Sequence, residues 1–148
     1  MGSRVSPELG RLLTERKITR SPISADMILK EVAAAESDLK DAQDSMQNDK
    51  FKWATIQAYY SMFHSARALL FSKDYREKSH IALLLAIREL FSKELERSLI
   101  DRFEDGMNLR QQADYSSTFS EAGAIDTIDG AEELLRKSKE ILRDKLKT

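Results

Sequence analysis

The chain has 148 residues, which is the size of one domain. Its 24 basic side chains are balanced by 25 acidic ones, and the resulting formal net charge of −1 gives no general attraction for nucleic acid or an anionic membrane. The absence of cysteine excludes disulfides, thiolate nucleophiles and cysteine-ligated metal centres. With only five glycines and two prolines, the composition favours a mostly helical, soluble, cytoplasmic protein. The longest apolar run, residues 81–87, is far too short to span a bilayer, so no membrane partner is expected.

The N-terminal part of the chain divides into two segments by charge. Residues 1–20 carry five basic and two acidic side chains, and we expect a loosely ordered basic arm there. Residues 21–148 are predicted to form a single domain. Ser21-Pro22 has the pattern of a helix start, with serine as the cap and proline at the first helical position. This first helix is predicted to end near Asn48, and its apolar residues recur at helical spacing opposite an acidic face.

A second helix is predicted from a cap at Asn48 or Asp49 to about Lys73. It contains most of the aromatic residues, and its apolar side chains cover more than half of its circumference. A helix of this kind contacts neighbours on several sides and is central in its fold. Because a single small bundle leaves part of such a surface uncovered, a homodimer is expected.

The second half of the chain predicts three more helices. The short charged link 74–78 is expected to turn the chain back antiparallel, with Ser79 capping a helix that ends near residue 91. Ser92 is predicted to cap a fourth helix, in which a glycine either permits close packing or is simply tolerated, and Ser120 to begin the last helix. The expected fold is therefore all-α, an antiparallel up-and-down bundle of four to five helices.

Few residues suggest chemistry directly. The sequence has no glycine-rich phosphate loop, no nucleophile elbow and no paired-histidine zinc motif, so no metal and no cofactor are expected. Tyr60, His64 and Arg67 follow one another at helical spacing and share one stripe of the second helix. They predict either a polar groove with a proton donor, an imidazole and a cation for phosphate, or a structural arrangement in which His64 bonds a neighbour and Arg67 reaches solvent.

Two further residues are candidates. Arg110 lies on the inward stripe of the fourth helix, where a guanidinium has to be paired, face a water-filled cleft or lie at a subunit interface. A local bridge to Asp114 is the structural alternative. His80 follows the capping Ser79, where the positive helix end favours a neutral imidazole. Either it fixes the preceding link by hydrogen bonds, or it takes part in catalysis.

Three segments together resemble prokaryotic HEPN-domain proteins (higher eukaryotes and prokaryotes nucleotide-binding). Ala58-Tyr-Tyr-Ser-Met-Phe-His-Ser-Ala-Arg-Ala-Leu-Leu70 resembles their second-helix signature, and Lys78-Ser-His80 resembles the Lys-Thr-His that opens their next helix. Leu109-Arg-Gln-Gln-Ala-Asp-Tyr115 resembles the closing segment of one small subfamily. The resemblance implies a bundle of four to five helices that commonly dimerises. It also implies a toxin–antitoxin setting with a minimal nucleotidyltransferase as partner, and metal-independent ribonuclease activity in many members.

The family's ribonuclease motif is an arginine followed, after four to six residues, by a histidine. Arg110 matches the arginine, but no histidine follows it, and Tyr115 stands five positions later. A tyrosine of ordinary pKa is a poor base at neutral pH. The first hypothesis is thus a non-catalytic module that binds a nucleotide, an RNA or the nucleotidyltransferase through Arg67, Arg110, Tyr115 and Tyr60. The second is an RNA-cleaving toxin in which Arg110 acts with His64 or His80. The third is a purely structural helical dimer.

Overall fold

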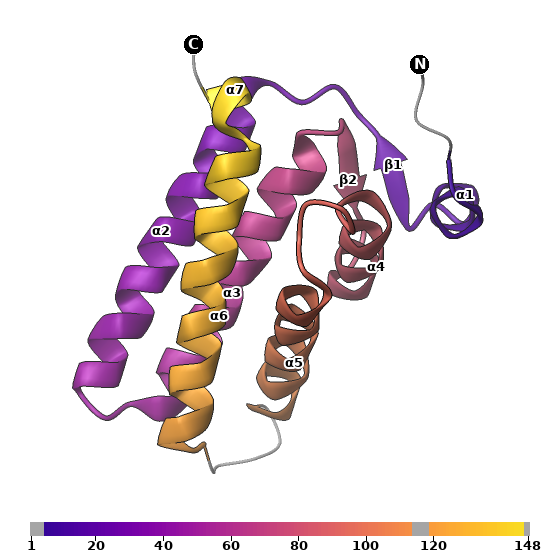
Figure 1. Ribbon diagram of the computed structural model, residues 1–148. Coiled ribbons are helices and arrows are strands. Elements are labelled where there is room, and N and C mark those ends of the chain that lie inside the picture. The colour runs from indigo at the N-terminus through magenta and orange to yellow at the C-terminus, as the bar shows by residue number, and fades with distance from the viewer. Residues whose placement is uncertain (1–4, 114–118, 147–148) are drawn as a thin grey trace.

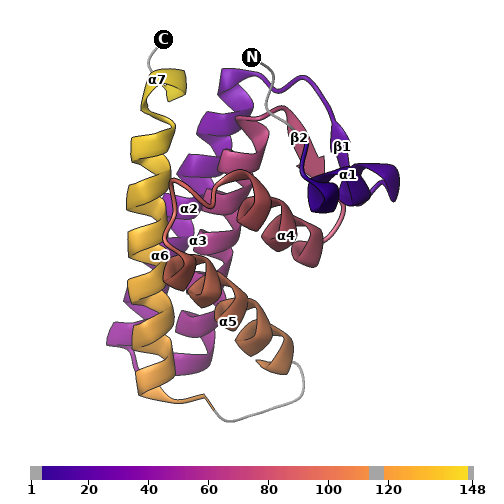
Figure 2. The same ribbon diagram turned by 45° about the vertical axis from the view of Figure 1, so that its right-hand side comes forward.

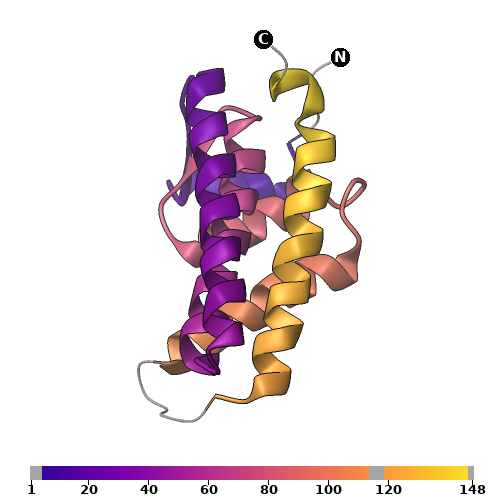
Figure 3. The same cartoon turned by 90° about the vertical axis from the view of Figure 1, so that its left-hand side faces the viewer.

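A computed structural model describes residues 5–113 and 119–146 of the chain. Three long helices lie side by side along the molecule, and a shorter one packs against two of them (Figure 1). The long helices are α2 (Ala25–Gln47), α3 (Phe51–Phe71) and α6 (Glu121–Ile141), and the shorter one is α5 (Arg97–Ala113). Seen from the side of α2, the helices α2 and α6 stand next to each other in front of the rest (Figure 3). The predicted all-α bundle is confirmed.

Helix α3 is the central element, as its sequence predicts. Thirteen of its 21 residues are buried, and it packs against α2, α4, α5 and α6. Alanines supply much of the contact: Ala54, Ala58 and Ala66 are fully buried, as is Ala35 of α2. Short side chains let the helix axes approach closely, so the long side chains between them fill the remaining space. Trp53 differs from the other aromatic residues of α3, because 53% of its surface is exposed.

The first two predicted helix starts are wrong by a few residues. The hydroxyl of Ser24, and not that of Ser21, caps α2 by accepting a hydrogen bond from the backbone N–H of Met27. The N–H of Ser21 instead donates to the carbonyl of Asp74, so Ser21 belongs to the connection that precedes the helix. At the start of α3, Asp49 has a φ of 57°, a left-handed turn conformation that is incompatible with an N-cap.

The later helix starts follow the sequence more closely. Ser79 caps α4 (His80–Leu90), and Ser120 caps α6, each by accepting a hydrogen bond from a backbone N–H three residues later. Ser92 does not cap α5. Phe91 and Leu95 are both buried, and the N–H of Leu95 donates to the carbonyl of Phe91, so these residues form a turn that delays the next helix to Arg97.

The N-terminal segment differs from the loosely ordered arm that its charge pattern predicts. Residues 7–20 form a helix, α1 (Pro7–Thr14), and a strand, β1 (Ile18–Arg20). Strand β1 pairs antiparallel with β2 (Tyr75–Glu77), which lies within the short charged link 74–78. The side chains of Leu9, Leu12 and Ile18 are buried. Pairing across more than 50 residues leaves no local sequence signal, which is why the pattern of this segment is misleading.

Helix α4 is also placed differently from the predicted up-and-down order. Figure 2 shows α4 and α1 running across the long axis of the bundle, not along it. Strand β2 lies between the end of α3 and the start of α4 in the chain, and both strands of the pair contact α4. A short helix, α7 (Arg143–Leu146), follows α6 after a break at Leu142. No helix among the described residues is both long enough and apolar enough to cross a membrane.

The burial of Ile18 makes the packing of the N-terminal segment testable. Its side chain has no exposed surface, so we expect Ile18→Ala to lower the free energy of unfolding by about 2–5 kcal/mol through lost burial and a residual cavity. Val5, which is 45% exposed, provides the control Val5→Ala, for which little change is expected. Urea denaturation measures both. Equal midpoints for Ile18→Ala and the unsubstituted chain would show that the segment does not contribute to the folded core.

Candidate functional site

Four aromatic rings from two helices form the centre of the candidate site, and we call them the His80 cluster: Tyr59, Tyr60, Phe63 and His80. The imidazole of His80 stacks on Phe63 with 4.5 Å between ring centroids and on Tyr59 with 5.7 Å. Tyr60 meets the imidazole edge-on at 6.3 Å. The spacing of the three α3 residues places them on the side that faces α4 and α5, and the Ser79 cap fixes His80 at the first position of α4.

A hydrogen bond joins the hydroxyl of Tyr59 to Nδ1 of His80, with 2.5 Å between the oxygen and the nitrogen. Burial, reinforced by the neighbouring Tyr60, raises the pKa of Tyr59 far above its usual range, so the phenol keeps its proton. Burial and, to a smaller extent, the positive charge of Arg110 lower the pKa of His80. The negative charge of Glu77 raises this pKa, but its effect is weaker. The imidazole is therefore neutral at pH 7, and its single ring hydrogen lies on either Nδ1 or Nε2.

The position of this hydrogen decides what the imidazole can do. If the Tyr59 hydroxyl donates to Nδ1, the hydrogen lies on Nε2, and His80 presents an N–H donor to a ligand. If Nδ1 donates to the hydroxyl oxygen, Nε2 has a free lone pair and can accept a proton. The first arrangement suits the binding of an anion, and the second suits general-base catalysis.

Arg110 approaches the His80 cluster from α5. Its guanidinium carbon lies 5.7 Å from the ring centroid of Tyr60, and its charge lowers the pKa of both Tyr59 and His80. Gly106, one turn before Arg110, lets α5 pack closely on α3, because a Cβ there would lie 2.7 Å from Cε of the buried Met62. The glycine therefore permits close packing and is not merely tolerated. Arg110 is partly exposed.

His64 lies in a different environment on the same stripe of α3. Its Nδ1 is 2.6 Å from a carboxylate oxygen of Glu31, and its Nε2 is 3.5 Å from one of Asp38, both on α2. Burial raises the pKa of Asp38, and the charge of His64 opposes this. Both nitrogens of His64 thus face carboxylates, and a phosphate at the same place would be repelled by them.

Arg67 is held by two carboxylates. Its Nε and Nη2 lie 2.8 and 2.7 Å from one oxygen of Glu77, and its Nη1 lies 3.4 Å from Glu31. The Glu77 side chain is only 4% exposed, and its other oxygen has no hydrogen-bond partner among the described residues. Because a buried carboxylate without its cation is costly, Arg67 serves first to neutralise Glu77.

The structure therefore divides the residues that the sequence singles out. Arg110, Tyr60 and His80 come together at the His80 cluster, whereas His64 and Arg67 join an ion-paired group with the acids of α2 and β2. Tyr115, and Asp114 as the predicted partner of Arg110, lie outside the described residues. Tyr59, Phe63, Glu31 and Glu77 are contacts that sequence reasoning misses. Across the described residues, no group of three or more histidine, aspartate or glutamate side chains is arranged to hold a metal ion.

Comparison with known protein families agrees with the helical fold. The HEPN domain family model matches residues 30–147, and the chain belongs to this family. The match begins within α2, so α1 and β1 lie outside it.

Two relatives come from Methanocaldococcus jannaschii, and the names of both describe them as toxins. Putative toxin MJ0605 is 32% identical over 121 residues, which cover 76% of this chain and 87% of the relative. Putative toxin MJ0142 is 32% identical over 89 residues, which cover 59% of this chain and 60% of the relative. The second match thus spans less than two thirds of that relative's length.

The proximity of Arg110 to His80 predicts a measurable electrostatic effect. We expect NMR titration to give His80 a pKa below 6.5, and Arg110→Gln to raise it, because removing the cation removes a cost of protonating the imidazole. Arg136→Gln, on the exposed surface of α6, is the matched control and is expected to leave this pKa unchanged. An identical His80 pKa in the Arg110→Gln variant would show that the two side chains are not neighbours in solution.

Proposed function

We propose that this chain is a toxin-type HEPN module that binds a phosphate group of RNA or of a nucleotide at Arg110 and the His80 cluster. The observation that carries the proposal is the meeting of Arg110 from α5 with His80 from α4 on the same tyrosine of α3. The names of the two relatives support the toxin setting.

The chemistry of binding follows from the groups at this point. The guanidinium of Arg110 offers paired N–H donors that match two phosphate oxygens. His80 adds an N–H donor at Nε2 when Tyr59 donates to Nδ1. Both donors are partly buried, which strengthens a charge-assisted hydrogen bond relative to one in water. Because the net charge of the chain is −1, affinity has to come from these local contacts and not from a general basic surface.

The partners that the family resemblance implies belong to the same proposal. A homodimer is proposed because the family that the sequence resembles commonly forms dimers. A minimal nucleotidyltransferase is proposed as the antitoxin. The alternative of a purely structural dimer predicts that substitution of Arg110 changes no binding property.

Titration calorimetry with a nucleoside monophosphate and with a short RNA tests the proposal. Loss of a hydrogen bond to a charged group typically costs 1.5–3 kcal/mol, so Arg110→Gln is expected to weaken binding by about tenfold or more. Arg136→Gln, which removes only exposed ion pairs on α6, is expected to bind as the unsubstituted chain does. Absence of heat with both ligands, or equal affinities of the two variants, contradicts the proposal.

RNA cleavage is the second candidate, and one observation favours it. The imidazole that lies beside Arg110 is neutral at pH 7, which is the state that a general base requires. In the tautomer with Nδ1–H, Nε2 of His80 can take the proton of a ribose 2′-hydroxyl, whose oxygen attacks the adjacent phosphorus as the 5′-oxygen leaves. Arg110 then stabilises the charge on the phosphate oxygens. His80, and not His64, is the base in this mechanism.

Cleavage is tested by incubating the protein with RNA in the presence of EDTA. The rate is expected to rise with pH through the lowered pKa of His80 and to level off near neutrality, because only the neutral imidazole accepts a proton. His80→Ala is expected to lower the rate by about 10²–10⁴-fold. If His80→Ala, Arg110→Ala and the unsubstituted chain give the same background, the cleavage mechanism is wrong.

A further inference from the structure

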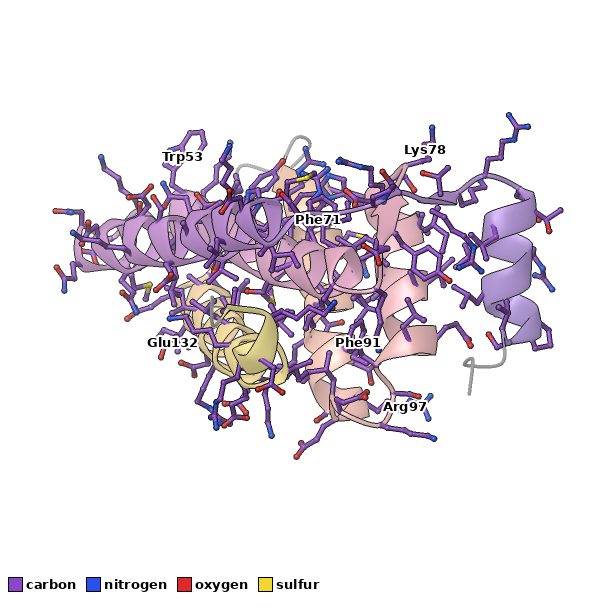
Figure 4. All side chains as sticks on the ribbon, turned by 90° about the horizontal axis from the view of Figure 1, so that it is seen from above. Trp53, Phe71, Lys78, Phe91, Arg97 and Glu132 are labelled. Atoms are coloured by element: carbon purple, nitrogen blue, oxygen red, sulfur yellow. The ribbon has the colours of Figure 1, made fainter. Side chains whose placement is uncertain are left out.

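Trp53 is the one tryptophan of the chain, and its position in the fold is unusual. It lies in the first turn of the most buried helix, yet 53% of its surface is exposed. Figure 4 shows its side chain projecting outward from α3, on the side of the molecule that also carries Lys78 and away from Phe91 and Arg97. Tryptophan is enriched at binding interfaces relative to the rest of the protein surface.

The indole lies on the same face of the helix as the candidate site. Trp53 and Tyr60 are seven residues apart, so they occupy one face of α3 about 10 Å from each other. Tyr60 is the ring over which the guanidinium of Arg110 lies. A ligand held at Arg110 can therefore reach Trp53 along a single helix face.

The ammonium group of Lys52 lies beside the indole of Trp53. The Nζ of Lys52 lies 5.5 Å from the ring centroid of Trp53. Lys52 precedes Tyr59 by seven residues, so the two side chains lie on the same side of α3. That side faces α5, because the ring of Tyr59 stacks on that of Phe103 with 5.9 Å between their centroids. Lys52 and Arg110 thus border the α3 face on the side of α5. On the other side, the acids of α2 hold His64. This asymmetry of charge directs phosphates toward α5.

We infer that Trp53 is a stacking platform for a base of single-stranded RNA, whose phosphates follow Lys52 toward Arg110. The inference rests on the proposed function, and it specifies the ligand as a single strand. Bases in a single strand expose their faces, and an aromatic ring beside a cation is the combination that binds them without reading sequence. A duplex hides its base faces in the stack and cannot use the indole.

The single tryptophan gives a direct readout. Selective excitation of the indole while a short single-stranded RNA is added is expected to show quenching that saturates at the concentration that saturates calorimetric binding. Trp53→Ala is expected to weaken binding by at least about fivefold, the lower end of what one stacked base contributes. Trp53→Phe, which keeps an aromatic face, is expected to recover part of the loss. Ile81→Ala, at a similarly exposed apolar residue of α4, is the control for surface apolarity.

The outcomes separate the inference from the proposed function. Binding that depends on Arg110 but neither quenches the indole nor weakens in Trp53→Ala overturns the inference and leaves the proposed function intact. Equal quenching by duplex and single strand overturns the assignment of a single strand. The indole fluorescence could instead change with protein concentration alone, and dimerisation could be lost in Trp53→Ala. Together these two results would show that a second copy covers Trp53, and they would overturn the inference. Absence of binding to any RNA overturns both.

Discussion

The burial of α3 is the constraint on which the rest of the structure depends. A helix that is apolar over most of its circumference has to be surrounded, and α2, α4, α5 and α6 all pack on it. Only one face stays partly open, and it carries Trp53, Tyr60, His64 and Arg67. Any ligand chemistry on α3 is therefore confined to this face and to the side chains that neighbouring helices bring to its borders.

The two borders of this face differ in charge, so the two histidines, His64 and His80, have different surroundings. On the side of α2, carboxylates hold His64 and Arg67. On the side of α4 and α5, His80 is packed among aromatic rings, and the largest effect of a charge on its pKa is the lowering by Arg110. The imidazole of His64 therefore contacts carboxylates, whereas that of His80 lies among aromatic rings near a cation, where we propose that an anion binds.

The helix pattern was predictable, because apolar spacing and serine caps are local signals. Ser79 and Ser120 cap the helices they were expected to cap. The errors occurred where a nonlocal contact overrides the local signal. Ser21 is drawn into a contact with Asp74, and the segment from Leu9 to Ile18 is ordered by pairing with a strand more than 50 residues away. The role of Gly106 also depended on a partner helix, since Met62 fills the space that a side chain would need.

The sequence by itself determined the helical class, the central place of α3 and the HEPN resemblance, and it singled out Arg110 as a candidate. Only the tertiary structure decided which histidine lies near that cation. His64 and Arg110 both belong to recognisable stripes, but the direction in which each stripe faces depends on how α2, α4 and α5 pack around α3. Helical periodicity fixes the relative positions of residues within one helix, whereas contacts between helices are set by how the helices pack against one another.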